Sequence, residues 1–154
     1  MVLAAGCRTS FARLGESPES VEQRYGKPLS STSLSDFTRC MYEKESFAIT
    51  VFYQNGVSVL ETFAKRGLDQ ATARQVVALV AAYSIGCPDA TQECKIRMAS
   101  GITAKDEVFW TWKKSAQSVN AAFNPVECTL AFFGEPSVYA SVHKALASDP
   151  LPGY

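Results

Sequence analysis

Apolar and polar positions alternate in two separate stretches of the chain. In residues 37–63, aromatic and β-branched side chains recur at every second position, as at Phe47, Ile49 and Val51. A period of two is typical of a β-strand with one buried face. Asn55-Gly56 interrupts this stretch, and both residues tolerate positive φ, which favours a two-residue hairpin. We predict three antiparallel strands, over 37–42, 47–53 and 57–63.

The alternation returns nearer the C-terminus. Val108, Trp110 and Trp112 alternate with Phe109 and Thr111. We predict a second set of three strands, over 108–112, 119–123 and 128–132. Asn124-Pro125 supplies a turn between the last two, because proline has no N–H to donate within a strand ladder.

Start and stop signals define a short helix in the stretch Leu14–Pro28. Ser17 can cap the first free amides, and Pro18 fits the first helical position. Gly26 allows a left-handed exit, and Pro28 prevents continuation. The Ser- and Thr-rich segment 29–35 that follows predicts a loop.

Two further segments have helical spacing. Residues 71–83 carry an apolar stripe, and residues 138–146, opened by 134–137, carry another. The stripe residues are Val76, Val77, Val80 and Tyr83 in the first segment and Val138, Tyr139, Val142 and Leu146 in the second.

The predicted order is therefore α-βββ-α-βββ-α, an α+β fold. We expect the two three-stranded meanders to join in one antiparallel sheet with the helices packed on one face. This arrangement buries more apolar surface and leaves fewer exposed edges than two small sheets. One domain over 13–149 is expected, flanked by a disordered N-terminus or signal-peptide remnant at 1–12 and a loose C-terminus at 150–154.

The first residues resemble the end of an export signal. Leu3-Ala4-Ala5-Gly6-Cys7 is similar to a bacterial lipobox, with Cys7 as the lipidated residue, although Ala4 stands where Leu or Val is usual. Ser10-Phe11-Ala12 offers a second cleavage pattern. We expect an exported protein, periplasmic or lipid-anchored in the bacterial envelope. The alternative is a frayed cytoplasmic N-terminus.

Charge narrows the choice of partner. The 15 Lys and Arg residues balance 15 Asp and Glu residues. Neither a nucleic acid nor an anionic membrane surface is expected as a partner, since both attract basic patches. The densest basic pair is Lys113-Lys114, typical of a solvated strand end. The sequence contains no stretch of about 18 apolar residues, so no transmembrane span is predicted.

The sequence predicts no catalytic, cofactor-binding or metal-binding residue. His143 is the single histidine and lies in the last predicted helix, with no cysteine placed beside it. Cys87 and Cys94 are spaced more widely than paired zinc ligands usually are. Phosphate loops, nucleophile elbows and zinc-protease motifs do not occur.

Export would make a disulfide plausible. With Cys7 lipidated or removed, Cys87–Cys94 is the natural pair, because it would pin a loop that contains proline. Cys40–Cys128 is the other candidate and requires neighbouring strands with side chains on one face. Cys40 and Cys128 could instead be buried free thiols.

Trp110 and Trp112 could mark a contact surface. Core packing is the alternative, because one face of this strand must be buried. Exposure of both rings together would favour a protein-binding face.

The string Leu14-Gly15-Glu16-Ser17, continued by Val21 and Tyr25-Gly26-Lys27-Pro28, resembles two groups of proteins. Over 13–63 it is similar to the BamE/SmpA family of small outer-membrane lipoproteins, in which a helix ending in Gly-x-Pro leads into a three-stranded sheet. It is more similar to uncharacterised exported bacterial proteins with an Arg-Leu-Gly-Glu-Ser-type segment after the signal peptide. Both resemblances imply an envelope location and a binding or structural role, and neither carries over a functional residue.

We therefore predict a non-enzymatic envelope protein, a protein-binding or structural module whose partner is another envelope protein. One alternative is a hydrolase or thiol enzyme that uses Cys and His or carboxylates. The other is a cytoplasmic partner-binding module.

Overall fold

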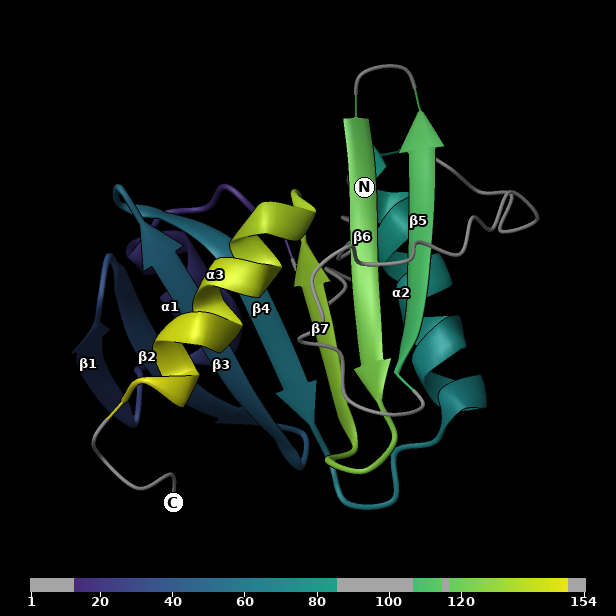
Figure 1. The fold of residues 1–154 in the computed structure, drawn as a ribbon, viewed down its shortest axis with the longest axis horizontal. Helices are drawn as coiled ribbons and strands as arrows, with labels where there is room; N and C mark the ends of the chain where they lie inside the picture. The colour runs from purple at the N-terminus through teal and green to yellow at the C-terminus, as the bar shows by residue number, and fades with distance from the viewer. Residues whose placement is uncertain (1–12, 86–106, 115–116, 150–154) are drawn as a thin grey trace, which may run out of the picture.

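A computed structural model describes residues 13–85, 107–114 and 117–149, with the side chains of 82–85 and 112–118 outside the described part (Figure 1). The elements are α1 (Pro18–Tyr25), β1 (Ser30–Leu34), β2 (Phe37–Lys44), β3 (Phe47–Gln54), β4 (Val57–Ala64), α2 (Gln70–Ile85), β5 (Val108–Lys114), β6 (Gln117–Asn124), β7 (Thr129–Phe133) and α3 (Pro136–Ala147). The predicted α+β class is confirmed.

All the strands form one antiparallel, seven-stranded sheet of order β1-β2-β3-β4-β7-β6-β5. The two meanders meet through β4 and β7, with Leu60 opposite Phe133 and Ala64 opposite Thr129. The second meander therefore enters the sheet by its last strand, which leaves β1 and β5 as the two edges (Figure 1).

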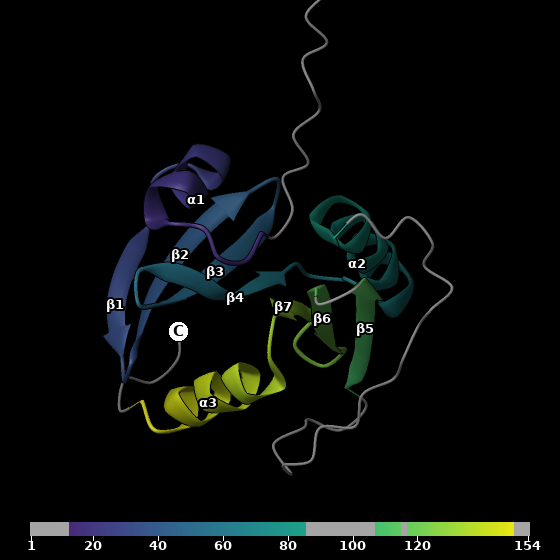
Figure 2. The same cartoon turned by 90° about the horizontal axis from the view of Figure 1, so that it is seen from above.

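The helices cover both faces of the sheet, so the expectation of helices on one face is wrong. Figure 2 shows α1 and α2 above the sheet and α3 below it. One core cluster joins α1 and α2 to inward residues such as Tyr42, Val51 and Phe132. A second cluster joins α3 to the opposite face through Phe52, Leu60 and Phe133. Because β-strand side chains alternate, the central strands have two apolar faces, and each face needs a cover.

The first meander has four strands rather than three. Residues 29–35 were expected to form a loop, but Ser30–Leu34 is strand β1, paired regularly with β2. Its first four residues are exposed and polar, so it shows no period-two pattern. Backbone pairing with β2 fixes this edge strand, together with side-chain hydrogen bonds from Cys40 and Arg39 of β2 to Ser31 and Thr32.

The signals around α1 are confirmed. The Ser17 side chain accepts from the Ser20 amide, Pro18 occupies the first turn, and Gly26 ends the helix at φ 89°. The Asn55-Gly56 hairpin is also confirmed, since both residues have positive φ, 54° and 79°.

A β-bulge lies just after this hairpin. Phe52 pairs with Leu60 while the next residue, Tyr53, pairs with Ser58, so Val59 is an extra residue in β4. Residues 58 and 61 would face opposite sides of a regular strand. The bulge turns both Ser58 and Glu61 toward the face that α1 covers.

Within the described residues, no helix is long and apolar enough to cross a membrane.

The β4–β7 junction predicts a strong effect of truncating Leu60, which is 1% exposed. Leu60→Ala should lower the free energy of unfolding by about 2–5 kcal/mol through lost burial and a cavity. Val126→Ala, at a residue 79% exposed, should change it by less than about 0.5 kcal/mol. Urea unfolding followed by tryptophan fluorescence measures both variants. Equal midpoints for the two would contradict the burial of Leu60 at this junction.

Candidate functional site

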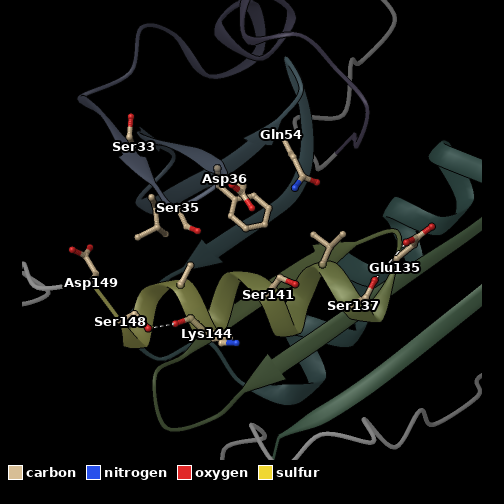
Figure 3. A pocket seen from close by; sticks show the side chains of 14 residues that line it. Ser33, Ser35, Asp36, Gln54, Glu135, Ser137, Ser141, Lys144, Ser148 and Asp149 are labelled. Atoms are coloured by element: carbon tan, nitrogen blue, oxygen red, sulfur yellow. Dashed lines mark hydrogen bonds between the residues drawn. The ribbon is translucent and has the colours of Figure 1, made fainter.

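A cleft of about 650 Å³ lies between the β1–β2 turn and α3 (Figure 3). The turn side contributes residues 33–37, with Gln54 from the end of β3. The α3 side contributes one face of the helix along its whole length, at the positions Glu135, Ser137, Val138, Ser141, Lys144, Ala145, Ser148 and Asp149. The cleft therefore follows the α3 axis.

The cleft has an apolar base and a polar rim. Leu34 and Phe37 are buried in the second core cluster, and Val138 packs against that cluster. Hydroxyl groups stand along both sides, and Figure 3 shows Ser33 and Ser35 across from Ser141. Such a surface offers apolar contact below and hydrogen-bond donors and acceptors above.

Carboxylates outnumber cations in the lining. Asp36, Glu135 and Asp149 contribute three acidic groups, and Lys144 contributes the one basic group. Asp149 is paired with Arg39, at 3.6 Å between Oδ2 and Nη2. Among the described residues, Asp36 and Glu135 take part in no ion pair, and both are exposed. The cleft is therefore complementary to a positive charge.

Aromatic packing fixes α3 beside this cleft. The Tyr139 ring stacks on Phe133 with centroids 4.7 Å apart and meets Phe109 edge-on at 6.1 Å. Its hydroxyl donates to Glu107. Burial, followed by the contact with Glu107, raises the pKa of Tyr139. The phenol therefore stays protonated and remains a donor.

His143 also packs against Tyr139, with ring centroids 4.3 Å apart. Burial lowers the pKa of His143, and the charges of Glu107 and Glu127 oppose that shift. His143 is not among the residues that line the cleft. The imidazole therefore belongs to the packing of α3.

The two described cysteines are free thiols. Cys40 is buried on β2 and donates to Ser31 Oγ, at 3.4 Å. Cys128 was expected within a strand, but it lies in the β6–β7 turn at φ 51° and donates to the Pro125 carbonyl at 3.7 Å. Neither thiol is bonded to His143. Cys7, Cys87 and Cys94 lie outside the described residues.

A Cys40–Cys128 disulfide does not form in this fold. Cys40 sits opposite Val51, whose row continues through Glu61 to Phe132 on β7. β2 and β7 are three strand spacings apart, on the order of 14 Å, whereas a disulfide needs Cα atoms within about 7 Å.

Trp110 does not lie on an exposed contact surface of the kind considered from the sequence. Trp110 is buried, 2% exposed, in the core cluster beneath α2. Trp112 lies on β5 opposite Val119, and its side chain is outside the described part. Within the described ranges, no group of three or more His, Cys, Asp or Glu residues could hold a metal ion.

A second polar cluster lies on the opposite face of the sheet, under α1. Glu61 of β4 is fully buried and accepts from Arg24 Nη2 at 3.0 Å and from the Tyr25 hydroxyl at 2.9 Å. Arg24 also pairs with Glu16, just before the helix. One guanidinium thus serves two carboxylates, and it ties both ends of α1 to β4.

Burial governs the protonation of Glu61. Removal from water raises its pKa to about 7, even though Arg24 and the Tyr25 hydrogen bond favour the charged form. The second carboxylate, Glu16, adds to the upward shift. Burial therefore brings the charge change of Glu61 close to neutral pH.

The segment that leads into α1 is held by the same part of β4. Ser58 Oγ donates to the Arg13 carbonyl and accepts from the Glu16 amide, both at 3.2 Å. The Ser58 backbone bonds to Gly15 and Glu16, at 2.7 and 2.8 Å. The bulged segment of β4 therefore anchors the chain that leads into α1, while Lys44 of β2 donates to the Arg24 carbonyl at the end of the helix.

Sequence reasoning missed Asp36, Glu135 and Glu61. Glu61 carried a detectable signal, since it is an acidic residue at an inward position between Leu60 and Phe63 of a strongly apolar strand. Asp36 and Glu135 resemble ordinary turn residues, and only the fold brings them to one cleft.

Comparisons with known proteins give little further constraint. No family model matches the chain, and no curated protein matches it. A solved extracellular protein containing an SCP domain, from Bacillus anthracis, aligns with a TM-score of 0.44 and 7% sequence identity over 82% of this chain and 45% of that one. The chain thus spans less than half of that protein, and a likeness of this size indicates neither shared family nor shared function.

The raised pKa of Glu61 predicts that stability falls as pH rises. The folded state holds this proton more tightly, so its contribution is complete below about pH 4.5 and lost on rising to about pH 7. The loss should be on the order of 3 kcal/mol. Glu61→Gln should remove this part of the profile, measured by urea unfolding between pH 4 and 8. The control is Glu43→Gln, at an exposed residue. Parallel pH profiles of stability for wild type and Glu61→Gln would contradict a raised pKa of Glu61.

Removing Arg24 should leave Glu61 buried without its cation. Arg24→Met is expected to cost about 3–5 kcal/mol at pH 8, whereas exposed Lys27→Met should be nearly neutral. The double variant Arg24→Met/Glu61→Leu should recover most of the loss, because no buried charge remains. Urea unfolding of the wild type, Arg24→Met, Glu61→Leu and the double variant forms a mutant cycle. Additive losses would mean that Arg24 and Glu61 act independently.

Proposed function

We propose that the protein is a non-enzymatic, protein-binding module of the bacterial envelope, and that its cleft holds an extended segment of a partner protein. The observation that carries the proposal is the open cleft along α3, with its apolar base and hydroxyl-lined rim. Pockets of this composition suit a polypeptide, which presents apolar side chains and backbone polar groups together.

The length of the cleft favours a peptide over a compact small molecule. Its lining recurs along the whole of α3, which has 12 residues and is about 18 Å long. An extended chain advances about 3.3 Å per residue, so roughly five residues would occupy the cleft.

The envelope location is supported by the lipobox-like pattern ending at Cys7 and by the resemblance of residues 13–63 to small outer-membrane lipoproteins. A cytoplasmic partner-binding module would use the same cleft, and the location of the native protein distinguishes the two. The thiol-enzyme alternative has weaker support, because Cys40 and His143 belong to opposite faces of the sheet.

Site-specific photo-cross-linking tests the proposal. A photoreactive amino acid at Ser137 or Ser141, on the exposed cleft side of α3, should yield an adduct of one defined mass in native cells. The same group at Glu19, exposed on α1 across the sheet, is the matched control. Denaturing gels and mass spectrometry identify the adducts.

Val138→Arg should abolish the adduct, because it places a charged group over the apolar base. Circular dichroism should show that the variant keeps its fold. Absence of an adduct at both cleft positions, or an equal adduct from Glu19, would argue against the cleft as the binding surface.

A further inference from the structure

A few contacts, rather than a broad apolar face, hold α1 on the sheet. Of its eight residues, Val21 and Tyr25 are the buried ones. A helix of this length does not persist in water by itself, because its few hydrogen bonds do not offset the entropy lost on forming it. Docking on the sheet therefore keeps α1 folded, and loss of the docking contacts would release the helix as a whole.

Glu61 lies at the centre of the docking contacts. It accepts from Arg24 Nη2 and from the Tyr25 hydroxyl, and Arg24 also pairs with Glu16. With Glu61 ionised, this group of two carboxylates and one guanidinium has a net charge of −1, which is costly away from water. The Nε of Arg24 is buried and makes no hydrogen bond to the described residues, so docking also costs this group its hydration.

The other groups that face Glu61 bring no compensating charge. The Arg13 backbone N–H donates to it from the segment before α1. On β3, burial raises the pKa of Tyr53, so that phenol stays neutral. The β7 residue opposite Glu61 is Phe132. Removal from water therefore outweighs the attraction of Arg24, and it raises the pKa of Glu61 to about 7.

We propose that residues 13–25 form a proton-controlled clasp, which opens as one unit while the sheet stays folded and opens more readily once Glu61 has lost its proton. Opening admits water to Glu61, which can then carry its charge without the cost of burial. It also uncovers Tyr42 and Phe63, whose ring centroids lie 5.8 and 6.2 Å from that of Tyr25. The sheet can stay folded because β2, β3 and β4 each keep a paired strand on both sides. The clasp is independent of the cleft and of the proposed function.

Native-state hydrogen exchange of the intact protein, followed by NMR in low concentrations of urea, tests the clasp. The amides of Val21 and Gly26 bond within α1 and its cap, and that of Ser58 bonds to the Glu16 carbonyl. These three amides should share one protection factor, lower than that of the β3 amides and nearly independent of urea. The β3 amides should exchange through global unfolding, with the full dependence on urea.

The pH dependence distinguishes the clasp from ordinary fraying of a helix end. After correction for intrinsic exchange rates, the shared protection factor should fall about 70-fold from pH 5 to pH 8. The reason is that the pKa of Glu61 is about 7 in the closed clasp and returns to its usual 4.5 in the open one. Glu61→Gln should abolish this fall, because its amide stays neutral throughout, whereas Glu43→Gln should retain it.

Four results would each overturn the inference. The amides of α1 could exchange only with global unfolding, at the full urea dependence. The amides of Val21, Gly26 and Ser58 could have unequal protection factors, which would mean fraying rather than one opening. The shared protection factor could be the same at pH 5 and pH 8. Glu61→Gln could show the same fall as the wild type.

Discussion

The pairing of β4 with β7 is the constraint on which the rest of the structure depends. It converts two meanders into one sheet and places strongly apolar residues at the centre of both faces. Two apolar faces require two covers, so α1 and α2 occupy one side and α3 the other. The cleft exists because α3 crosses to the side of the β1–β2 turn. Without the β4–β7 ladder, the apolar face that α3 covers would not form, and α3 would not pack there.

The two faces divide the polar chemistry between them. Under α1, the sheet carries a buried carboxylate with an arginine and a tyrosine, a costly arrangement that fixes one geometry but offers little access to solvent. Beside α3, the polar groups are exposed hydroxyls and carboxylates above an apolar base. The first arrangement suits specification of the fold, and the second suits recognition of another molecule. A module that binds a partner needs both, since a rigid scaffold limits the entropy lost on binding.

Local signals made most of the elements predictable from the sequence. Ser17, Pro18 and Gly26 define α1, and Asn55-Gly56 defines the β3–β4 hairpin, because each acts through its own backbone. Strand β1 was missed because Ser and Thr at an edge have no burial pattern. The placement of α3 was wrong because alternation shows that a strand has two faces but does not show which helix covers each. The cleft was not predictable, since Asp36 and Glu135 are 99 positions apart in the sequence and line one cleft only through the sheet order.

The bulge at Val59 sets the phase of β4 on either side of it. Cross-strand partners share a face, so Ser58, opposite Tyr53, and Glu61, opposite Val51, both face the α1 side. Deleting Val59 would restore regular pairing and leave both residues on that side. A regular register of the same length would instead turn Ser58 away from Arg13 and Glu16. Homologous chains that retain α1 should therefore keep these two positions on one face, either through a bulge or through one residue fewer between them.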